Sequence, residues 1–190
     1  MMRPQLVIVS GLPGVGKSRV AARLSSHYRL PLVAKDTIKE TLFDTLGTGE
    51  PRWSRLLSNA SFAAMFAVAS QVLTAGGSVM LEGNFRPGEH ENAVRELLAT
   101  RARRVIQVLC RLPEEQRRQR LEQRAMREER HPGHLDLLLL RRDAERNLSA
   151  DQFLNLPSSC LLHNTEGDAE LAWERLRQDM DLLLANSEST

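Results

Sequence analysis

The stretch Gly11–Ser18, with the sequence GLPGVGKS, decides the fold of this chain. It has the spacing G-x-x-x-x-G-K-S, follows the apolar run Leu6–Val9 and precedes a helical pattern that begins near Arg19. A buried strand, a glycine-rich turn and a helix in this order form a loop whose backbone amides surround an anion. The N-terminus of the following helix also favours negative charge. The stretch therefore predicts a phosphate-binding loop after the first strand.

The residue types in this loop each have a chemical role. Glycines allow backbone conformations and close approaches that a Cβ would block. Lys17 is expected to reach the β- and γ-phosphates of a nucleotide, and the hydroxyl of Ser18 is expected to ligate Mg²⁺. The predicted nucleotide contacts in this region are Gly11, Pro13, Gly14, Val15, Gly16, Lys17, Ser18 and Arg19.

The length and charge of the chain are those of an ordinary globular protein. Its 190 residues suit one domain, so residues 1–190 are predicted to form a single domain. A formal net charge of +2 gives no electrostatic argument for nucleic acid or membrane as a partner. We expect no signal segment and no membrane span, because the first strand begins almost at once and no apolar run approaches ~20 residues. Cys110 and Cys160 lie in apolar runs and are expected to be buried, reduced thiols, which favours a cytoplasmic enzyme.

Five short apolar segments alternate with helical patterns along the chain. Continuous apolarity is typical of strands buried on both faces, so we predict an α/β fold with a parallel sheet between two layers of helices. In such folds ligands bind beyond the carboxyl ends of the strands. The predicted strands are residues 5–10, 31–34, 78–81, 105–112 and 159–163, and the predicted helices are residues 17–28, 37–46, 52–75, 89–100, 113–130, 135–148 and 169–184.

The longest helical pattern, residues 52–75, shows apolar residues every three or four positions. This spacing predicts one buried face. The expected core residues are Trp53, Leu57, Ala60, Ala64 and Ala67.

Asp36 directly follows the second predicted strand and is expected to start the next helix. A carboxylate near the γ-phosphate can accept a proton from an attacking hydroxyl, so we predict a catalytic or substrate-orienting role. The alternative is a plain helix N-cap, although Lys39 three residues on leaves the capping box incomplete. Lys39 is itself a candidate substrate contact, with a solvated helix lysine as the favoured alternative.

Polar residues also follow the third and fifth predicted strands. Glu82 is a candidate for holding Mg²⁺, directly or through water, and the alternative is a structural acid paired with Asn84. Asn84 and Arg86 are candidates for orienting the acceptor. Asn164 and Thr165 are candidate contacts for the nucleotide base, with a simple turn as the alternative.

The helix after Pro113 carries four regularly spaced arginines. At 100° per residue they fall within an arc of about 80°. Because the apolar stripe of this helix is thin, we predict a lid over roughly residues 114–135 that brings arginines over the phosphates. The alternative is a solvated face paired with neighbouring glutamates. The arginines are Arg117, Arg120, Arg124 and Arg127; Arg124 and Arg127 are predicted to be catalytic, and Arg120 is predicted to contact the nucleotide.

Four segments together resemble the P-loop kinases of the zeta-toxin and polynucleotide-kinase-like type: the glycine-rich loop, Lys35–Lys39, Leu81–Phe85 and the arginine-rich helix. Chloramphenicol phosphotransferase and gluconate kinase are similar in layout. The resemblance implies a P-loop NTPase fold with strand order 2-3-1-4-5, ATP as the phosphate donor, and Asp36 as the base that activates the acceptor. The chain departs from the pattern at Glu82, where Asp is usual, and at Lys39, where the polynucleotide kinases have Arg.

The predicted function is an ATP- and Mg²⁺-dependent kinase that transfers the γ-phosphoryl group to a hydroxyl of a small molecule. A 5′-hydroxyl polynucleotide kinase or RNA-repair component is an alternative, but it calls for a basic, aromatic-studded channel, and aromatics make up only 4% of this chain. A regulatory nucleotide-binding ATPase is a third possibility. Acceptor specificity is expected to lie in the long helix from Arg52, the loop at residues 84–86 and the lid.

Overall fold

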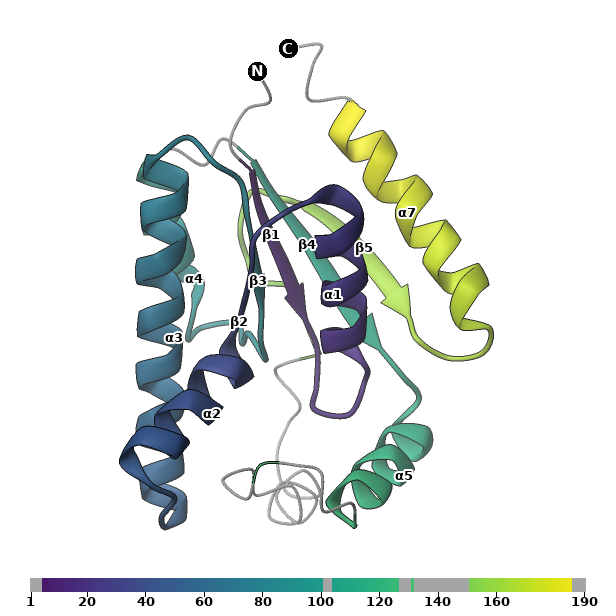
Figure 1. Ribbon diagram of the computed structural model, residues 1–190. Helices are drawn as coiled ribbons and strands as arrows, with labels where there is room; N and C mark the ends of the chain where they lie inside the picture. Colours follow the sequence, from purple (N-terminus) through teal and green to yellow (C-terminus); the bar gives the residue numbers. More distant parts are fainter. Residues whose placement is uncertain (1–4, 101–103, 127–130, 132–150, 186–190) are drawn as a thin grey trace.

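The computed structural model describes residues 5–100, 104–126, 131 and 151–185 of the chain. Five parallel strands form one sheet in the order β2-β3-β1-β4-β5 (Figure 1), which confirms the order implied by the resemblance. This arrangement is the α/β fold of P-loop NTPases. The strands are β1 (Gln5–Ser10), β2 (Leu32–Ala34), β3 (Val79–Glu82), β4 (Arg104–Arg111) and β5 (Ser159–Asn164).

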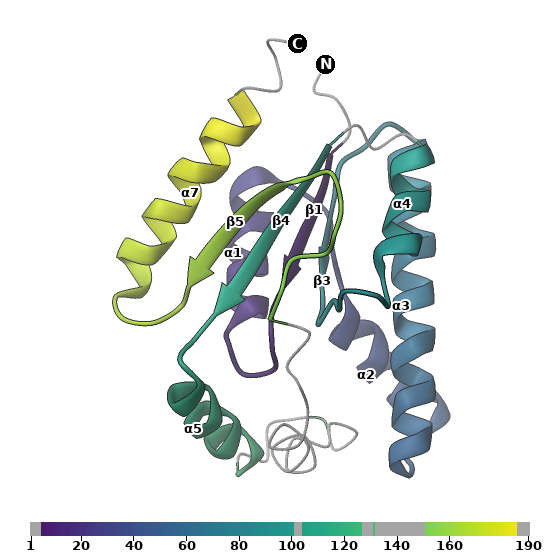
Figure 2. The ribbon, with the colours of Figure 1, turned by 180° about the vertical axis from the view of Figure 1, so that it is seen from behind.

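Helices cover the sheet on both faces, as the sequence predicts. α1 and α7 pack on one face, and α3 and α4 pack on the other (Figures 1 and 2). The predicted boundaries agree with the structure to within two residues, except at the end of α5. The predicted helix at residues 135–148 lies outside the described residues. The helices are α1 (Lys17–Tyr28), α2 (Lys35–Leu46), α3 (Pro51–Thr74), α4 (Glu91–Thr100), α5 (Glu114–Ala125) and α7 (Ala169–Ala185).

The central strand β1 is buried on both faces, which confirms the interpretation of its apolar run. Val7 and Val9 pack with α1 and α7, whereas Leu6 and Ile8 pack with α3 and α4. All four side chains are fully buried. Side chains that alternate between two apolar layers require apolar residues at every position of the strand.

The buried face of α3 differs from the predicted one. Leu57 is buried as expected, but the helix turns Phe62, Met65 and Leu73 toward the sheet. These larger side chains remove more apolar area from water than alanine does, so they decide the rotation of the helix. Ala60, Ala64 and Ala67 are exposed, and Trp53 is half-buried.

α3 is long and apolar enough to cross a membrane, judged by length and composition only. Helices that pack on the core of a soluble protein pass the same test, so one such helix is weak evidence for a span. In this protein Phe62, Met65 and Leu73 of α3 pack against the sheet.

The two cysteines have different surroundings. Cys110 is buried in β4, as predicted. The prediction for Cys160 is wrong, because β5 is an edge strand and Cys160 is exposed, as is Leu162 two residues later. A strand at the sheet edge needs apolar residues on one face only.

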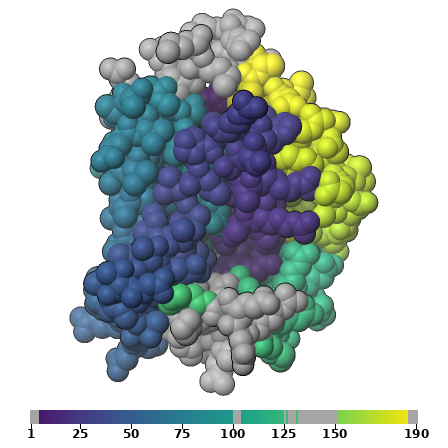
Figure 3. All heavy atoms as spheres, in the orientation of Figure 1, coloured from purple at the N-terminus to yellow at the C-terminus, as the bar shows by residue number. Residues whose placement is uncertain are grey.

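The carboxyl ends of the strands define the functional end of the molecule. The loop after β1, helix α2 and helix α5 all gather at this end (Figures 1 and 2). In the space-filling view the glycine-rich loop, in purple, lies between the blue of α2 and the green of α5 (Figure 3).

Candidate nucleotide-binding and active site

The glycine-rich loop connects Ser10, at the end of β1, to Lys17, the first residue of α1. Gly14 and Gly16 have φ angles of +90° and +87°, in the left-handed region that favours glycine. Gly16 occupies the N-cap position of α1 and provides no side-chain cap. The amide groups at the start of α1 are therefore suited to bind an external anion.

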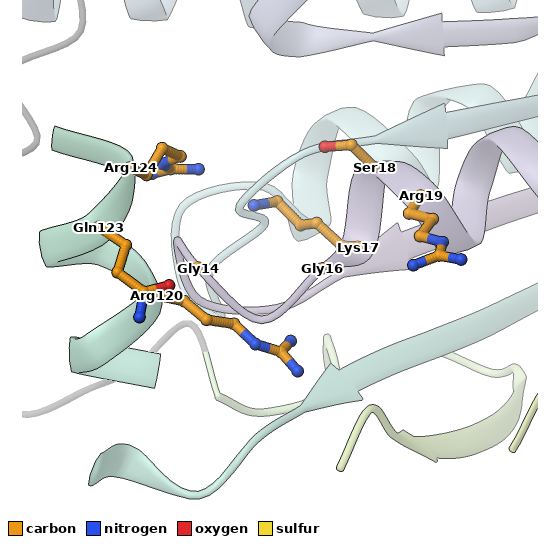
Figure 4. A pocket seen from close by; sticks show the side chains of 8 residues that line it. All are labelled: Gly14, Gly16, Lys17, Ser18, Arg19, Arg120, Gln123 and Arg124. Carbon is orange, nitrogen blue, oxygen red and sulfur yellow. The ribbon is translucent and has the colours of Figure 1, made fainter. Parts of the chain in front are cut away.

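A cavity of about 340 Å³ lies between this loop and α5. Figure 4 shows the side chain of Lys17 extending from the loop toward α5, where Gln123 and Arg124 face it. The structure thus brings together residues that are more than 100 positions apart in the sequence, as the predicted nucleotide site requires. The lining residues are Gly14, Gly16, Lys17, Ser18, Arg19, Arg120, Gln123 and Arg124.

Glu82 lies at the end of β3, and its register opposite Val9 of β1 places it beside the loop. Its Oε1 is 3.9 Å from Nζ of Lys17 and accepts a hydrogen bond of 3.4 Å from Oγ of Ser18. Burial raises the pKa of the Glu82 carboxyl, and the nearby ammonium of Lys17 opposes this shift. These contacts place Glu82 in a cluster with Lys17 and Ser18 rather than in the predicted alternative pair with Asn84.

Asp36 lies in the first turn of α2, because the helix begins two residues earlier than the sequence predicted. The helix begins at Lys35 with Ala34 as the N-cap, so the N-cap alternative for Asp36 is wrong. Nζ of Lys35 is 3.0 Å from Oδ1 of Asp36. The Lys35 side chain is only 8% exposed, whereas that of Asp36 is 39% exposed, so a buried ammonium holds a carboxylate that reaches the solvent.

Lys39 is buried, which contradicts the expectation of a solvated helix lysine. Its Nζ donates a hydrogen bond of 2.9 Å to Oγ of Ser54 in α3 and lies 5.2 Å from the ring centroid of Phe43. A buried ammonium needs such partners because it leaves water at a high cost. Lys39 thus joins α2 to α3, and its predicted substrate contact stays a prediction.

The loop after β3 places the other predicted acceptor residues. Phe85 is fully buried in the core, and its carbonyl accepts a hydrogen bond from Ser10. Asn84 and Arg86 flank it and are partly exposed. The guanidinium of Arg86 lies 3.4 Å from the carboxylate of Glu89, and its backbone N–H donates to Nδ1 of His90.

Helix α5, the first part of the predicted lid, has two fully buried side chains that the prediction did not include. Arg117 is fully buried, and its guanidinium forms a two-pronged ion pair with Glu114 and donates to the carbonyl of Pro13. Leu121 is also fully buried and packs against Gly14. The first turns of α5 are therefore docked on the glycine-rich loop, because the neutralised arginine can be buried with the leucine. Arg120 and Arg124 line the cavity, and Arg127 lies outside the described residues.

The residues after β5 contact the glycine-rich loop, so they are more than the simple turn that was the alternative prediction. Oγ1 of Thr165 donates a 2.7 Å hydrogen bond to the carbonyl of Val15. Asn164 is exposed, and its side chain accepts a hydrogen bond from the N–H of Glu166. The predicted contacts of Asn164 and Thr165 with a nucleotide base stay predictions.

Two features of the site were not anticipated from the sequence, and a third was anticipated only as an alternative. The ion pair between Lys35 and Asp36 joins two sequence neighbours, and no pattern marks Lys35. Pairing of the α5 arginines with neighbouring glutamates was the alternative to a lid, and the Arg117–Glu114 pair has the expected spacing of three on a helix. No sequence pattern indicates the contact of His131 with α2, because its Nε2 lies 3.0 Å from Oδ1 of Asp44, which is 87 positions away.

The comparisons with known proteins agree with this arrangement. Residues 6–143, more than half of the chain, match a family model described as an AAA domain. The chain therefore belongs to this family, and the match identifies it as a P-loop kinase-like protein. A comparison with curated proteins finds no match.

Solved structures with the same fold include three described as kinases. A candidate kinase from Chloroflexus aurantiacus J-10-fl is 29% identical with a TM-score of 0.80, over 93% of this chain and 98% of that one. A sugar kinase from Janibacter sp. HTCC2649 is 16% identical with a TM-score of 0.60, over 97% and 98% of the two chains. A gluconokinase from Sinorhizobium meliloti 1021 is 14% identical with a TM-score of 0.54, over 96% and 98%. The last two share the fold.

Proposed function

We propose that this chain is a Mg²⁺-dependent kinase that transfers the γ-phosphoryl group of ATP to a hydroxyl of a small molecule, with Asp36 as the base. The observation that carries the proposal is a partly exposed carboxylate at the end of β2, held by Lys35, near a phosphate-binding loop. Strand order places β2 beside β3, whose last residue, Glu82, contacts Lys17. A base and a phosphate cradle at one edge of a sheet are the two parts that transfer to an alcohol requires.

The loop and α5 supply the charge for binding a nucleotide. Backbone amides of the glycine-rich loop, the N-terminus of α1 and the ammonium of Lys17 surround the site of the phosphates. Arg120 and Arg124 face the same cavity from α5. Phosphoryl transfer depends mainly on positioning and on neutralising charge, so these groups account for donor binding and for transition-state stabilisation.

The residues beside Lys17 fit a magnesium ion. Mg²⁺ prefers oxygen ligands, and it keeps several waters while it binds one or two protein oxygens and substrate phosphates. The hydroxyl of Ser18 and the carboxylate of Glu82 are such oxygens, and they lie 3.4 Å apart. Ser18 and Glu82 would hold the ion, which would neutralise charge on the phosphates when bound.

The chemical step follows from these positions. The acceptor hydroxyl gives its proton to the carboxylate of Asp36 while its oxygen forms a bond to the γ-phosphorus. The bond between the γ-phosphorus and the bridging oxygen of ATP breaks, and ADP leaves with that electron pair. Lys35 orients the carboxylate through the 3.0 Å contact with Oδ1.

A small acceptor is favoured over a nucleic acid end by charge and composition. The net charge of +2 and an aromatic content of 4% provide little of the basic, stacking surface that single strands bind. A cytoplasmic location is part of the same proposal.

The experiment that tests the proposal separates donor binding from transfer. Lys17→Ala should abolish measurable binding of MgATP in calorimetry, because it removes the ammonium that faces the phosphates. Asp36→Asn should keep MgATP affinity within about twofold and lower the transfer rate by about 10²–10⁴-fold, the range of general base catalysis. Asp179→Asn, an exposed change on α7, is the matched control and should leave both unchanged. Normal turnover by Asp36→Asn would refute the role of Asp36 as base.

A further inference from the structure

Two carbonyl oxygens of the glycine-rich loop are each held by a side chain from elsewhere in the fold. Nη1 of Arg117 in α5 donates to the carbonyl of Pro13 at 3.1 Å. Oγ1 of Thr165, directly after β5, donates to the carbonyl of Val15 at 2.7 Å. Neither Pro13 nor Val15 is close in sequence to its partner, so the fold itself builds these contacts.

Arg117 is held rigidly in this contact. It is among the largest fully buried side chains, and the carboxylate of Glu114 accepts from its Nε and Nη2 at 2.7 and 2.8 Å. A planar guanidinium bound at two of its nitrogens presents the third in a fixed direction. That direction is toward the carbonyl of Pro13.

The hydroxyl of Thr165 lies closer to the carbonyl of Val15 than to that of Arg111. Oγ1 lies near two carbonyls, that of Val15 at 2.7 Å and that of Arg111 at 3.0 Å. A hydroxyl carries one proton, and the carbonyl of Arg111 also accepts the backbone N–H of Thr165 at 2.9 Å. We therefore assign the hydroxyl proton to the shorter contact, with the carbonyl of Val15.

The partners of these carbonyls fix the direction of two amide groups. In a planar trans peptide the C=O and the following N–H point in opposite directions. The carbonyl of Pro13 shares a peptide plane with the N–H of Gly14, and that of Val15 shares one with the N–H of Gly16. Holding both carbonyls away from the cavity turns both N–H groups toward it, where Gly14 and Gly16 form part of the lining.

We propose that Arg117 and Thr165 are positioning residues for phosphate binding, which aim the amides of Gly14 and Gly16 by holding the carbonyls of Pro13 and Val15. The inference rests on the proposed use of ATP. Glycine peptides rotate easily because they lack a Cβ. A rotated plane would present a carbonyl oxygen, instead of an N–H, to a phosphate. The two residues prevent this by holding the carbonyls of Pro13 and Val15.

The test removes the Thr165 hydroxyl and compares ligands with and without a base. We expect Thr165→Val to weaken binding of MgATP and of inorganic tripolyphosphate by the same factor, about three- to tenfold, the range for one net hydrogen bond. Thr165→Ser should restore both affinities. Thr45→Val is the matched control, since Thr45 also donates to a backbone carbonyl, at 2.8 Å, but on an exposed part of α2.

An amide readout separates positioning from stability. In ¹H–¹⁵N spectra of the wild type, the Gly16 amide should shift strongly on addition of tripolyphosphate, and this shift should shrink in Thr165→Val. The Gly14 amide should respond in the same way in Arg117→Lys, which keeps a charge but loses the fixed fork. If Arg117→Lys does not fold, Thr165→Val alone decides the result.

The outcomes have separate meanings. Weaker binding of MgATP with unchanged binding of tripolyphosphate would overturn the inference and assign Thr165 to the base. Unchanged affinity for both ligands would overturn it while leaving the proposed function in place. No binding of either ligand by the wild type would overturn the proposed function, and this inference with it.

Discussion

Replacing Gly14 with alanine is expected to destabilise the protein strongly, because this residue lies where α5 meets the glycine-rich loop. A Cβ at Gly14 would lie 2.9 Å from Cγ of Leu121 and 3.2 Å from the carbonyl of Arg117. Leu121 is fully buried, so it cannot move aside into solvent. The φ angle of +90° adds strain for any residue with a side chain.

The size of the effect follows from two separate costs. The left-handed backbone costs roughly 1–2 kcal/mol for an L-residue. Forcing an extra methyl into a packed site costs roughly 1–3 kcal/mol. Together they predict a loss of about 2–5 kcal/mol in the free energy of unfolding.

Two other glycines provide matched controls. Gly16 has a φ of +87°, and within the part of the chain that the structure describes a Cβ there would meet only Nη1 of Arg120, at 3.7 Å. Gly167 has a φ of +78°, and a Cβ there would have no atom of the described residues within 4 Å. Alanine at either position should cost roughly 1–2 kcal/mol, from the backbone alone. Gly16→Ala should also weaken MgATP binding, whereas Gly167→Ala should not.

Denaturant unfolding of the three variants, with MgATP binding measured in parallel, checks this reasoning. If Gly14→Ala is as stable as Gly16→Ala or more stable, the packing of α5 on the loop is refuted. Equal loss of MgATP affinity in Gly167→Ala would refute the assignment of the loop as the phosphate cradle.

Two further predictions concern buried acid and thiol groups. Burial raises the pKa of the Glu82 carboxyl above its ordinary value of 4.5, so the folded state binds this proton more tightly than the unfolded state does. The protonated carboxyl therefore stabilises the fold below pH 4.5, and this stabilisation is lost as the pH rises through the raised pKa. Glu82→Gln should therefore gain stability relative to the wild type between pH 4 and pH 7 while losing transfer activity; a pH-independent difference in unfolding free energy would contradict this. Burial also raises the pKa of Cys110 to about 12, whereas Cys160 is exposed. An aromatic disulfide reagent should thus modify one thiol in the folded protein, and Cys160→Ser should abolish that reaction; equal reaction rates for the two thiols would show that Cys110 is accessible.

The fold was predictable because its signals are local. The glycine-rich loop fixes a strand, a turn and a helix at once, and the alternation of apolar runs with helical patterns fixes a covered parallel sheet. The strand order came from the resemblance to P-loop kinases, since periodicity carries no information on which strands are neighbours. The position of Asp36 and Glu82 at strand ends followed from the same rule.

The errors arose where side-chain size or long-range contacts decide the outcome. In α3 the regular alanine spacing indicated one face, but Phe62 and Met65 remove more apolar area and rotate the helix. Lys39 was interpreted as a solvated helix lysine, and Arg117 was assigned to a lid over the phosphates, but both side chains are buried. Glu114 and Ser54 provide the partners that allow their burial, and only the fold brings Lys39 to Ser54.

The central claim is most directly tested by measuring ADP release from MgATP by the purified protein. The assay compares a panel of small hydroxyl-bearing metabolites and antibiotics with 5′-hydroxyl oligonucleotides, and it includes Asp36→Asn. The account predicts that one class of small molecule stimulates ADP release, that the acceptor gains a phosphoryl group, and that Asp36→Asn loses the stimulation. Stimulation by the oligonucleotides alone, or tight ATP binding with no transfer to any acceptor, would contradict it.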